Sequence, residues 1–135
     1  MTSDPSIPGP GTRLLTEQLG LADPLAELAA HHPPGEHLQR LARALGQTAV
    51  DLDAAYTRAR QAGSILRDLR AQRDIRHLVD EIAAVAQELE RELVRFDVID
   101  TALIRLLAVY LDLTKETERT AAGGSPARRE ACRPA

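Results

Sequence analysis

A seven-residue apolar repeat runs through two long stretches of this chain. In the later stretch, apolar residues recur every seven positions from Ile75 to Tyr110, and a second set from Leu78 to Leu113 follows in the same frame. In the earlier stretch the repeat runs from Leu38 to Leu66. A period near 3.5 residues keeps one seam of a helix against a partner helix, so the pattern predicts coiled-coil-like helix packing.

The frame of the repeat slips between Leu69 and Ile75, and the residues between them, 70–74, are mostly polar. We place a tight turn there, with Asp74 as the N-cap of the following helix. The slip then predicts an antiparallel hairpin of two long helices over 36–72 and 74–119. A break at Gly63-Ser64 is the alternative, because Gly can end one helix and Ser can cap the next.

Two short helices are predicted before the hairpin. The first covers 12–19, with Gly20 placed to cap its C-terminus. The second covers 24–32, because Asp23 suits an N-cap, Pro24 suits the first helical position, and two prolines follow His32. We expect these helices to pack on the open end of the hairpin.

The two ends of the chain are predicted to be disordered tails. Residues 1–11 contain three prolines and two glycines and offer little apolar surface to bury. After Thr120 the run Ala-Ala-Gly-Gly-Ser-Pro predicts that the helix stops, which leaves 121–135 as the second tail.

Composition narrows the class of protein. The chain of 135 residues has one Phe, two Tyr and no Trp, so its core must come from Leu, Ile, Val and Ala, which suits narrow helix interfaces. Only Lys115 among the 17 basic residues is Lys, and with the abundant Ala this skew is typical of a high-GC bacterium. The net charge of −3 argues against wholesale nucleic-acid binding.

The sequence motifs bear on the compartment and the cofactors of the protein. The single Cys132 cannot form an internal disulfide, and the first residues lack the basic and apolar regions of a signal peptide. The most apolar stretch, 93–113, carries too many charges for a membrane span. With no Gly-rich phosphate loop in the sequence, we expect a cytoplasmic protein without a cofactor.

An arginine cluster occupies the segment 57–76, which holds six Arg against Asp68 and Asp74. The hairpin would bring this charge to one tip, where guanidinium groups suit contact with an acidic partner protein or with phosphates. A solvated face is the other interpretation. The candidate contact residues are Arg58, Arg67, Arg70, Arg73 and Arg76.

The histidines His31, His32 and His37 cluster around Glu36 and a Pro-Pro-Gly turn. Imidazoles and a carboxylate are suitable ligands for a transition metal, but structural zinc sites usually use four ligands at tighter spacing. Histidine also suits a helix C-terminus on electrostatic grounds, and we predict no metal site.

The segment from Asp97 to Leu107 resembles the first helix of the helical chorismate mutases, in which an Ile-Asp pair precedes a Leu-rich run. The resemblance covers about fifteen residues. In that family an Arg ten positions after the Asp helps bind the substrate carboxylates, and here that position is Tyr110; the position of a second Arg falls on Leu93. A carboxylate clamp needs those guanidinium groups, so we predict that the protein is not an enzyme.

The last helix is too apolar for a single partner. Of residues 93–113, 15 of 21 are apolar, although a helix with one neighbour needs only a stripe. We therefore expect self-association as a homodimer, or a helical partner protein, through this region. We also expect Asp100, at the edge of the apolar stripe, to pair with an Arg of the facing helix. The predicted interaction residues are Val94, Val98, Ile104, Val109 and Leu111.

Together these observations predict an all-α fold: a long antiparallel hairpin with two short helices packed on it and disordered tails. The function they favour is a non-enzymatic interaction or adaptor module. The alternative is a nucleic-acid-associated accessory protein that uses the arginine cluster.

Overall fold

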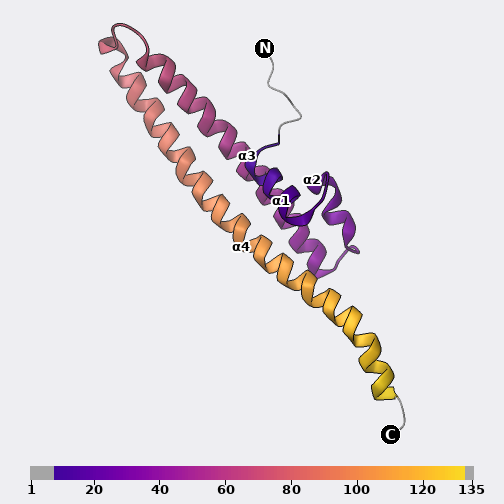
Figure 1. Ribbon diagram of the computed structural model, residues 1–135. Coiled ribbons are helices and arrows are strands. Elements are labelled where there is room, and N and C mark those ends of the chain that lie inside the picture. Colours follow the sequence, from indigo (N-terminus) through magenta and orange to yellow (C-terminus); the bar gives the residue numbers. More distant parts are fainter. Residues whose placement is uncertain (1–7, 133–135) are drawn as a thin grey trace.

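A computed structural model describes the backbone of residues 8–132 and the side chains of residues 8–120. Within this part of the chain every regular element is a helix, which confirms the predicted all-α class. Two long helices, α3 (His37–Arg70) and α4 (Val79–Cys132), lie side by side and run in opposite directions (Figure 1). The 34 residues of α3 span about 51 Å at 1.5 Å per residue.

The chain folds back where the repeat changes frame. Helix α3 continues unbroken through Gly63 and Ser64, and the short 3-10 helix η2 (Arg76–Leu78) leads into α4. No Gly or Pro is needed in this turn, because Asp74 accepts hydrogen bonds from both the backbone N–H and the guanidinium group of Arg76, each at 3.1 Å. Those hydrogen bonds lower the pKa of the Asp74 carboxyl.

Helix α4 ends later than predicted. Its backbone continues to Cys132 and not to residue 119, through the Gly-Gly-Ser-Pro sequence. Gly and Pro reduce helix propensity, but an established helix gains one hydrogen bond for each residue added, so its end is hard to place from these residues alone. Of the two predicted tails, residues 1–7 and 133–135 lie outside the described part of the chain.

The N-terminal helices agree with their predicted capping signals. Helix α1 (Pro10–Leu19) ends at Gly20, whose φ of 68° lies in the left-handed region and whose N–H donates to the Thr16 carbonyl. Helix α2 (Pro24–Glu27) begins after Asp23, whose side chain accepts from the N–H of Ala26. The predicted helix 24–32 is in fact this α-helical turn followed by the 3-10 helix η1 (Ala29–His31).

Residues 10 and 11, predicted as part of the disordered tail, form the first turn of α1. Gly11 donates its N–H to the carboxylate of Asp53 at 2.7 Å, and the Thr12 hydroxyl donates to the same carboxylate at 2.6 Å. A Cβ at Gly11 would lie 2.5 Å from the Ala49 carbonyl oxygen, so only glycine allows α1 to approach α3 this closely. The carboxylate of α3 therefore anchors a segment that composition alone suggests is unstructured.

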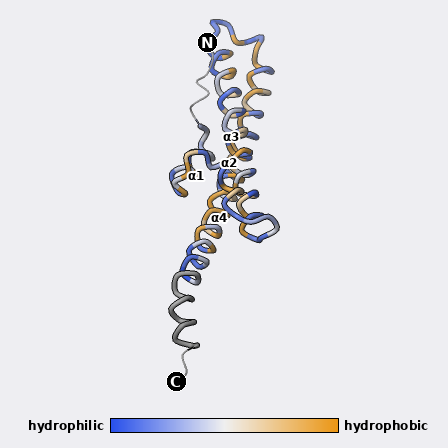
Figure 2. The backbone as a smooth tube through the Cα atoms, turned by 90° about the vertical axis from the view of Figure 1, so that its right-hand side faces the viewer, coloured by the Kyte–Doolittle hydropathy of each residue, from blue (hydrophilic) through white to orange (hydrophobic). Residues whose placement is uncertain are grey.

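The core lies in the half of the hairpin nearest its open end, where α1 and η1 pack against α3 and α4 (Figure 1). Toward the turn, the core narrows to the contact between the two long helices, and Ala55, Ala59 and Ala62 fill the α3 side of it. Hydrophilic and hydrophobic residues alternate within the turns of both long helices (Figure 2). The main buried cluster comprises Leu15, Leu28, Ala42, Leu45, Ala49, Leu52, Leu103, Leu107 and Tyr110.

Candidate interaction surfaces

Helix α4 exposes large apolar side chains on the side turned away from α3. Val94, Val98, Ile104 and Val109 retain 59, 65, 52 and 49% of their accessible surface. Single exposed apolar residues are normal on protein surfaces, but four within sixteen positions of one helix are not scattered. These four belong to the set that the sequence predicts for interaction.

The fifth predicted residue, Leu111, is placed differently. It is half-buried and packs against the core cluster, beside the cleft where the N-terminal helices meet α4. The other four do not form one patch. At about 100° per residue, Ile104 lies about 120° around the helix from Val98. Val94, Val98 and Val109 therefore share one side of α4, and Ile104 belongs to another.

A shallow groove accompanies this side of α4. It has a volume of about 600 Å³, and its apolar lining comes from Val94, Val98 and Ile99. Arg91 and Arg95 border the groove, together with Gln87 and Glu90. All of the lining residues come from the one helix, so the groove is a surface feature that a neighbouring helix can fill, not an enclosed ligand cavity.

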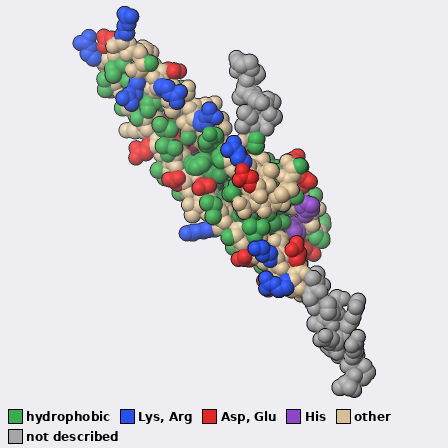
Figure 3. Space-filling view, in the orientation of Figure 1, with side chains coloured by type: hydrophobic (Ala, Val, Ile, Leu, Met, Phe, Trp, Pro, Cys, Tyr) green, Lys and Arg blue, Asp and Glu red, His purple; other side chains and the backbone are tan. Residues whose placement is uncertain are grey.

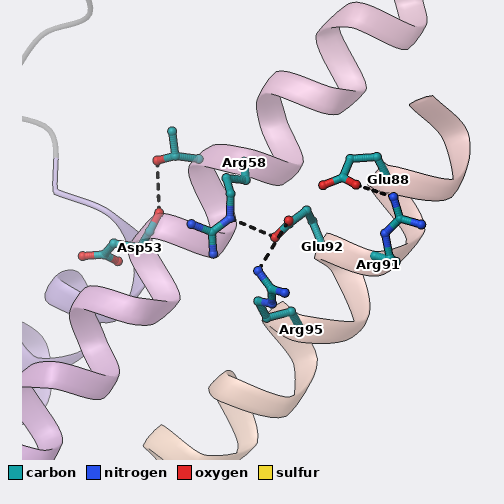
Figure 4. A network of polar contacts seen from close by, with 7 residues as sticks. Asp53, Arg58, Glu88, Arg91, Glu92 and Arg95 are labelled. Carbon is teal, nitrogen blue, oxygen red and sulfur yellow. Dashed lines mark hydrogen bonds and ion pairs between the residues drawn. The ribbon is translucent and has the colours of Figure 1, made fainter. Parts of the chain in front are cut away.

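One carboxylate is buried between the two long helices. Glu92 is only 4% exposed, and its Oε1 accepts from Arg58 Nε of α3 at 3.1 Å (Figure 4). Arg95 approaches the other oxygen at 3.6 Å from the next turn of α4. We expected Asp100 to be the acid paired across the hairpin, but the ion pair that crosses it uses Glu92. The signal was present, because Glu92 occupies the heptad position midway between Val85 and Ile99.

Some arginines of the cluster form ion pairs with acids of the chain, and others are exposed without such a pair among the described residues. Arg58 holds Glu92, and Arg76 holds Asp74. Arg67, Arg70 and Arg73 form no ion pair with a described residue and lie exposed at the tip, where basic side chains gather (Figure 3). Arg67 and Arg70 border a groove of about 530 Å³ whose floor includes Leu66 and Leu89. The hairpin brings these groups together as predicted for a tip, beside apolar surface.

The side chains of the three clustered histidines do not point toward a common site. His31 and His37 are exposed, whereas His32 turns inward and its Nε2 lies 2.6 Å from the hydroxyl of Tyr110. The two rings meet edge to face, with centroids 5.6 Å apart. Burial raises the pKa of Tyr110. Among residues 8–120, no three His, Cys, Asp or Glu side chains are arranged to hold a metal ion.

Comparisons with known proteins give no family to assign. No protein-family model, curated protein or solved structure matches the chain significantly. The structure adds one finding on membranes: over the described residues, no helix combines the length and the hydropathy needed to cross a bilayer. The exposed surfaces of the described residues are therefore the features that bear on function.

Proposed function

We propose that this protein is a non-enzymatic helical interaction module that self-associates through the exposed apolar side chains of α4. The observation that carries the proposal is the exposure of Val94, Val98 and Val109, which share one side of a helix that packs against α3 along another side. Exposed apolar side chains concentrated in this way mark interaction sites on soluble proteins.

Val98→Asp tests the proposal. A carboxylate at the most exposed apolar position of α4 would have to be desolvated on association, so we expect the dissociation constant to rise at least about thirtyfold. Sedimentation velocity over a concentration series measures this change. Val79→Asp is the matched control, because Val79 lies in the first turn of the same helix and is similarly exposed, at 57%.

Equal effects of the two substitutions would contradict the proposal, because they would mean that Val98 has no special place in association. Both positions are exposed, so neither substitution should disturb the monomer. A circular dichroism melt of each variant checks that the helical content and the midpoint of unfolding are unchanged.

A second candidate function uses the tip. Arg67, Arg70 and Arg73 are exposed and adjoin an apolar groove, which favours an acidic partner protein or a nucleic acid at this end. Replacing these three by Gln should abolish binding of a labelled duplex in a mobility-shift titration, and that binding should weaken steeply with salt. Gln at Arg40 and Arg43, exposed at the other end of α3, is the control. No shift at low salt would exclude the nucleic-acid form.

A further inference from the structure

One flank of α4 carries a continuous apolar stripe. Its members, which we call the α4 stripe, are Val98, Ala102, Leu106, Val109 and Leu113, at intervals of four, four, three and four residues. This spacing keeps side chains on one side of a helix. Leu106 is half-buried at the inner edge, and the other four are exposed. Ile104 lies outside the stripe, so the self-association surface narrows to this flank.

Charges of opposite sign flank the two ends of the α4 stripe. Toward the hairpin tip, Arg91 and Arg95 are exposed. They also contact acids of their own helix, Arg91 with Glu88 and Arg95 with the buried Glu92 (Figure 4). Contact with Arg91 lowers the pKa of Glu88.

The other end of the stripe is acidic. Asp112 and Glu116 are exposed there, and the intervals from Val98 and Val109 place them on the same side of the helix. Arg105, also exposed, lies at the edge of the stripe near its centre. The charges on this side are therefore two arginines at the tip end, each beside an acid of its own helix, and two exposed acids at the far end.

We propose that a second copy of the chain packs antiparallel on the α4 stripe, with the two-fold axis at Ala102. This inference depends on the proposed function, because it describes the geometry of the same self-association. About this axis Arg91 of one copy faces the partner's Leu113, which Asp112 and Glu116 flank, and Arg95 faces the partner's Val109. Parallel copies would instead bring each charge beside its own like charge, which is unfavourable.

Side-chain size fits the same axis. Ala102 meets itself at the crossing point, where the smallest side chain of the stripe allows the two helices to approach most closely. Val98 then faces Leu106 of the partner, and Leu106 faces the partner's Val98, so that the residues at the centre of the stripe meet apolar residues of the other copy. Such a self-complementary contact is the kind that a two-fold dimer requires.

Distances between spin labels, measured by pulsed electron paramagnetic resonance, test this arrangement. Single cysteines are placed at Thr101 or Glu90, both exposed on α4 beside the stripe, in a Cys132→Ser background. Antiparallel copies put the two labels at Thr101 within about 20 Å of each other, because helix axes pack about 8–10 Å apart. The two labels at Glu90 are then separated by about 36 Å along the axis, from a rise of 1.5 Å per residue.

The outcomes separate the inference from the proposal on which it depends. Short distances at both positions would mean parallel copies, and a long distance at Thr101 would put the axis elsewhere; either result overturns the antiparallel arrangement while self-association stands. No dipolar signal in either variant, with a monomeric mass at the same concentration, would overturn self-association itself.

Discussion

Tyr110 and His32 join the N-terminal segment to the last helix. The hydroxyl of Tyr110 and the imidazole of His32 share a hydrogen bond of 2.6 Å across 78 positions of sequence. Tyr110 belongs to the main core cluster, so its ring also contributes apolar contact. A tyrosine suits this place because its ring packs while its hydroxyl satisfies a partner at the rim.

The burial of Tyr110 predicts a stability that depends on pH. Burial raises the pKa of its phenol above the ordinary 10.0, so the folded protein holds this proton more tightly than the unfolded chain. The stabilisation is complete below the unfolded pKa and is lost as pH rises through the folded pKa. We expect the unfolding free energy of the wild type to fall above pH 10, and we expect Tyr110→Phe to reduce that fall.

Urea unfolding at a series of pH values measures this effect. Below pH 10, Tyr110→Phe should lower the unfolding free energy by about 1 kcal/mol, because the hydrogen bond to His32 is lost. Tyr56→Phe is the control, since Tyr56 lies exposed on α3 and should leave the pH profile as in the wild type. An unchanged profile in Tyr110→Phe would contradict the assignment.

At the scale of the helices, the register of α3 against α4 is marked by one charged pair. Glu92 takes a seam position that would otherwise hold an apolar residue, and Arg58 reaches it from the facing helix (Figure 4). Arg58 is partly exposed, so the pair lies at the edge of the seam and not deep in a core. A buried ion pair adds little net stability, but removing one partner leaves the other as a buried charge without a counter-ion, which is destabilising.

Two substitutions at this pair should change the free energy of unfolding by different amounts, or in opposite directions. Arg58→Ala leaves the Glu92 carboxylate with only Arg95, so we expect a loss of about 1–2 kcal/mol in the free energy of unfolding. Glu92→Leu removes the charge that needs a partner and should be neutral or slightly stabilising. Urea unfolding of both single variants and of the double variant completes the cycle. An equal cost of Arg58→Ala in both backgrounds would show that the two residues are not coupled.

The helical elements were largely predictable because their signals are local or periodic. The heptad frame and its slip gave the two long helices and the fold-back, and Gly20 and Asp23 gave the ends of the short helices. Contacts between distant positions were not predictable in this way. Nothing local connects Asp53 with Gly11, and that contact is what orders the start of α1.

The candidate site was predictable in part, for a similar reason. An excess of apolar residues over 93–113 identified α4 as the exposed helix, and four of the five predicted residues are exposed. Which of those residues share one side of α4 cannot be used until the position of α3 is known, because α3 determines which side of the helix remains exposed to solvent. The same holds for the arginines: sequence placed them at a tip, but their partners Glu92 and Asp74 decide which are engaged.

At the scale of the whole molecule, the N-terminal helices close one side of the hairpin near its open end, and the α4 stripe remains uncovered. A two-helix hairpin buries only a narrow seam, so a further helix on this open flank is the simplest way to complete the core. In the proposed dimer a second copy supplies that helix, and its acidic end lies beside Arg91 of the first copy. Self-association is thus the central claim.

Sedimentation equilibrium of the wild-type protein tests that claim most directly. With a chain mass of 14.7 kDa, the weight-average mass should rise toward twice this value as the concentration increases from about 10 μM to 1 mM, a range that detects dissociation constants up to about millimolar order. A mass that stays at 14.7 kDa throughout the range would contradict self-association.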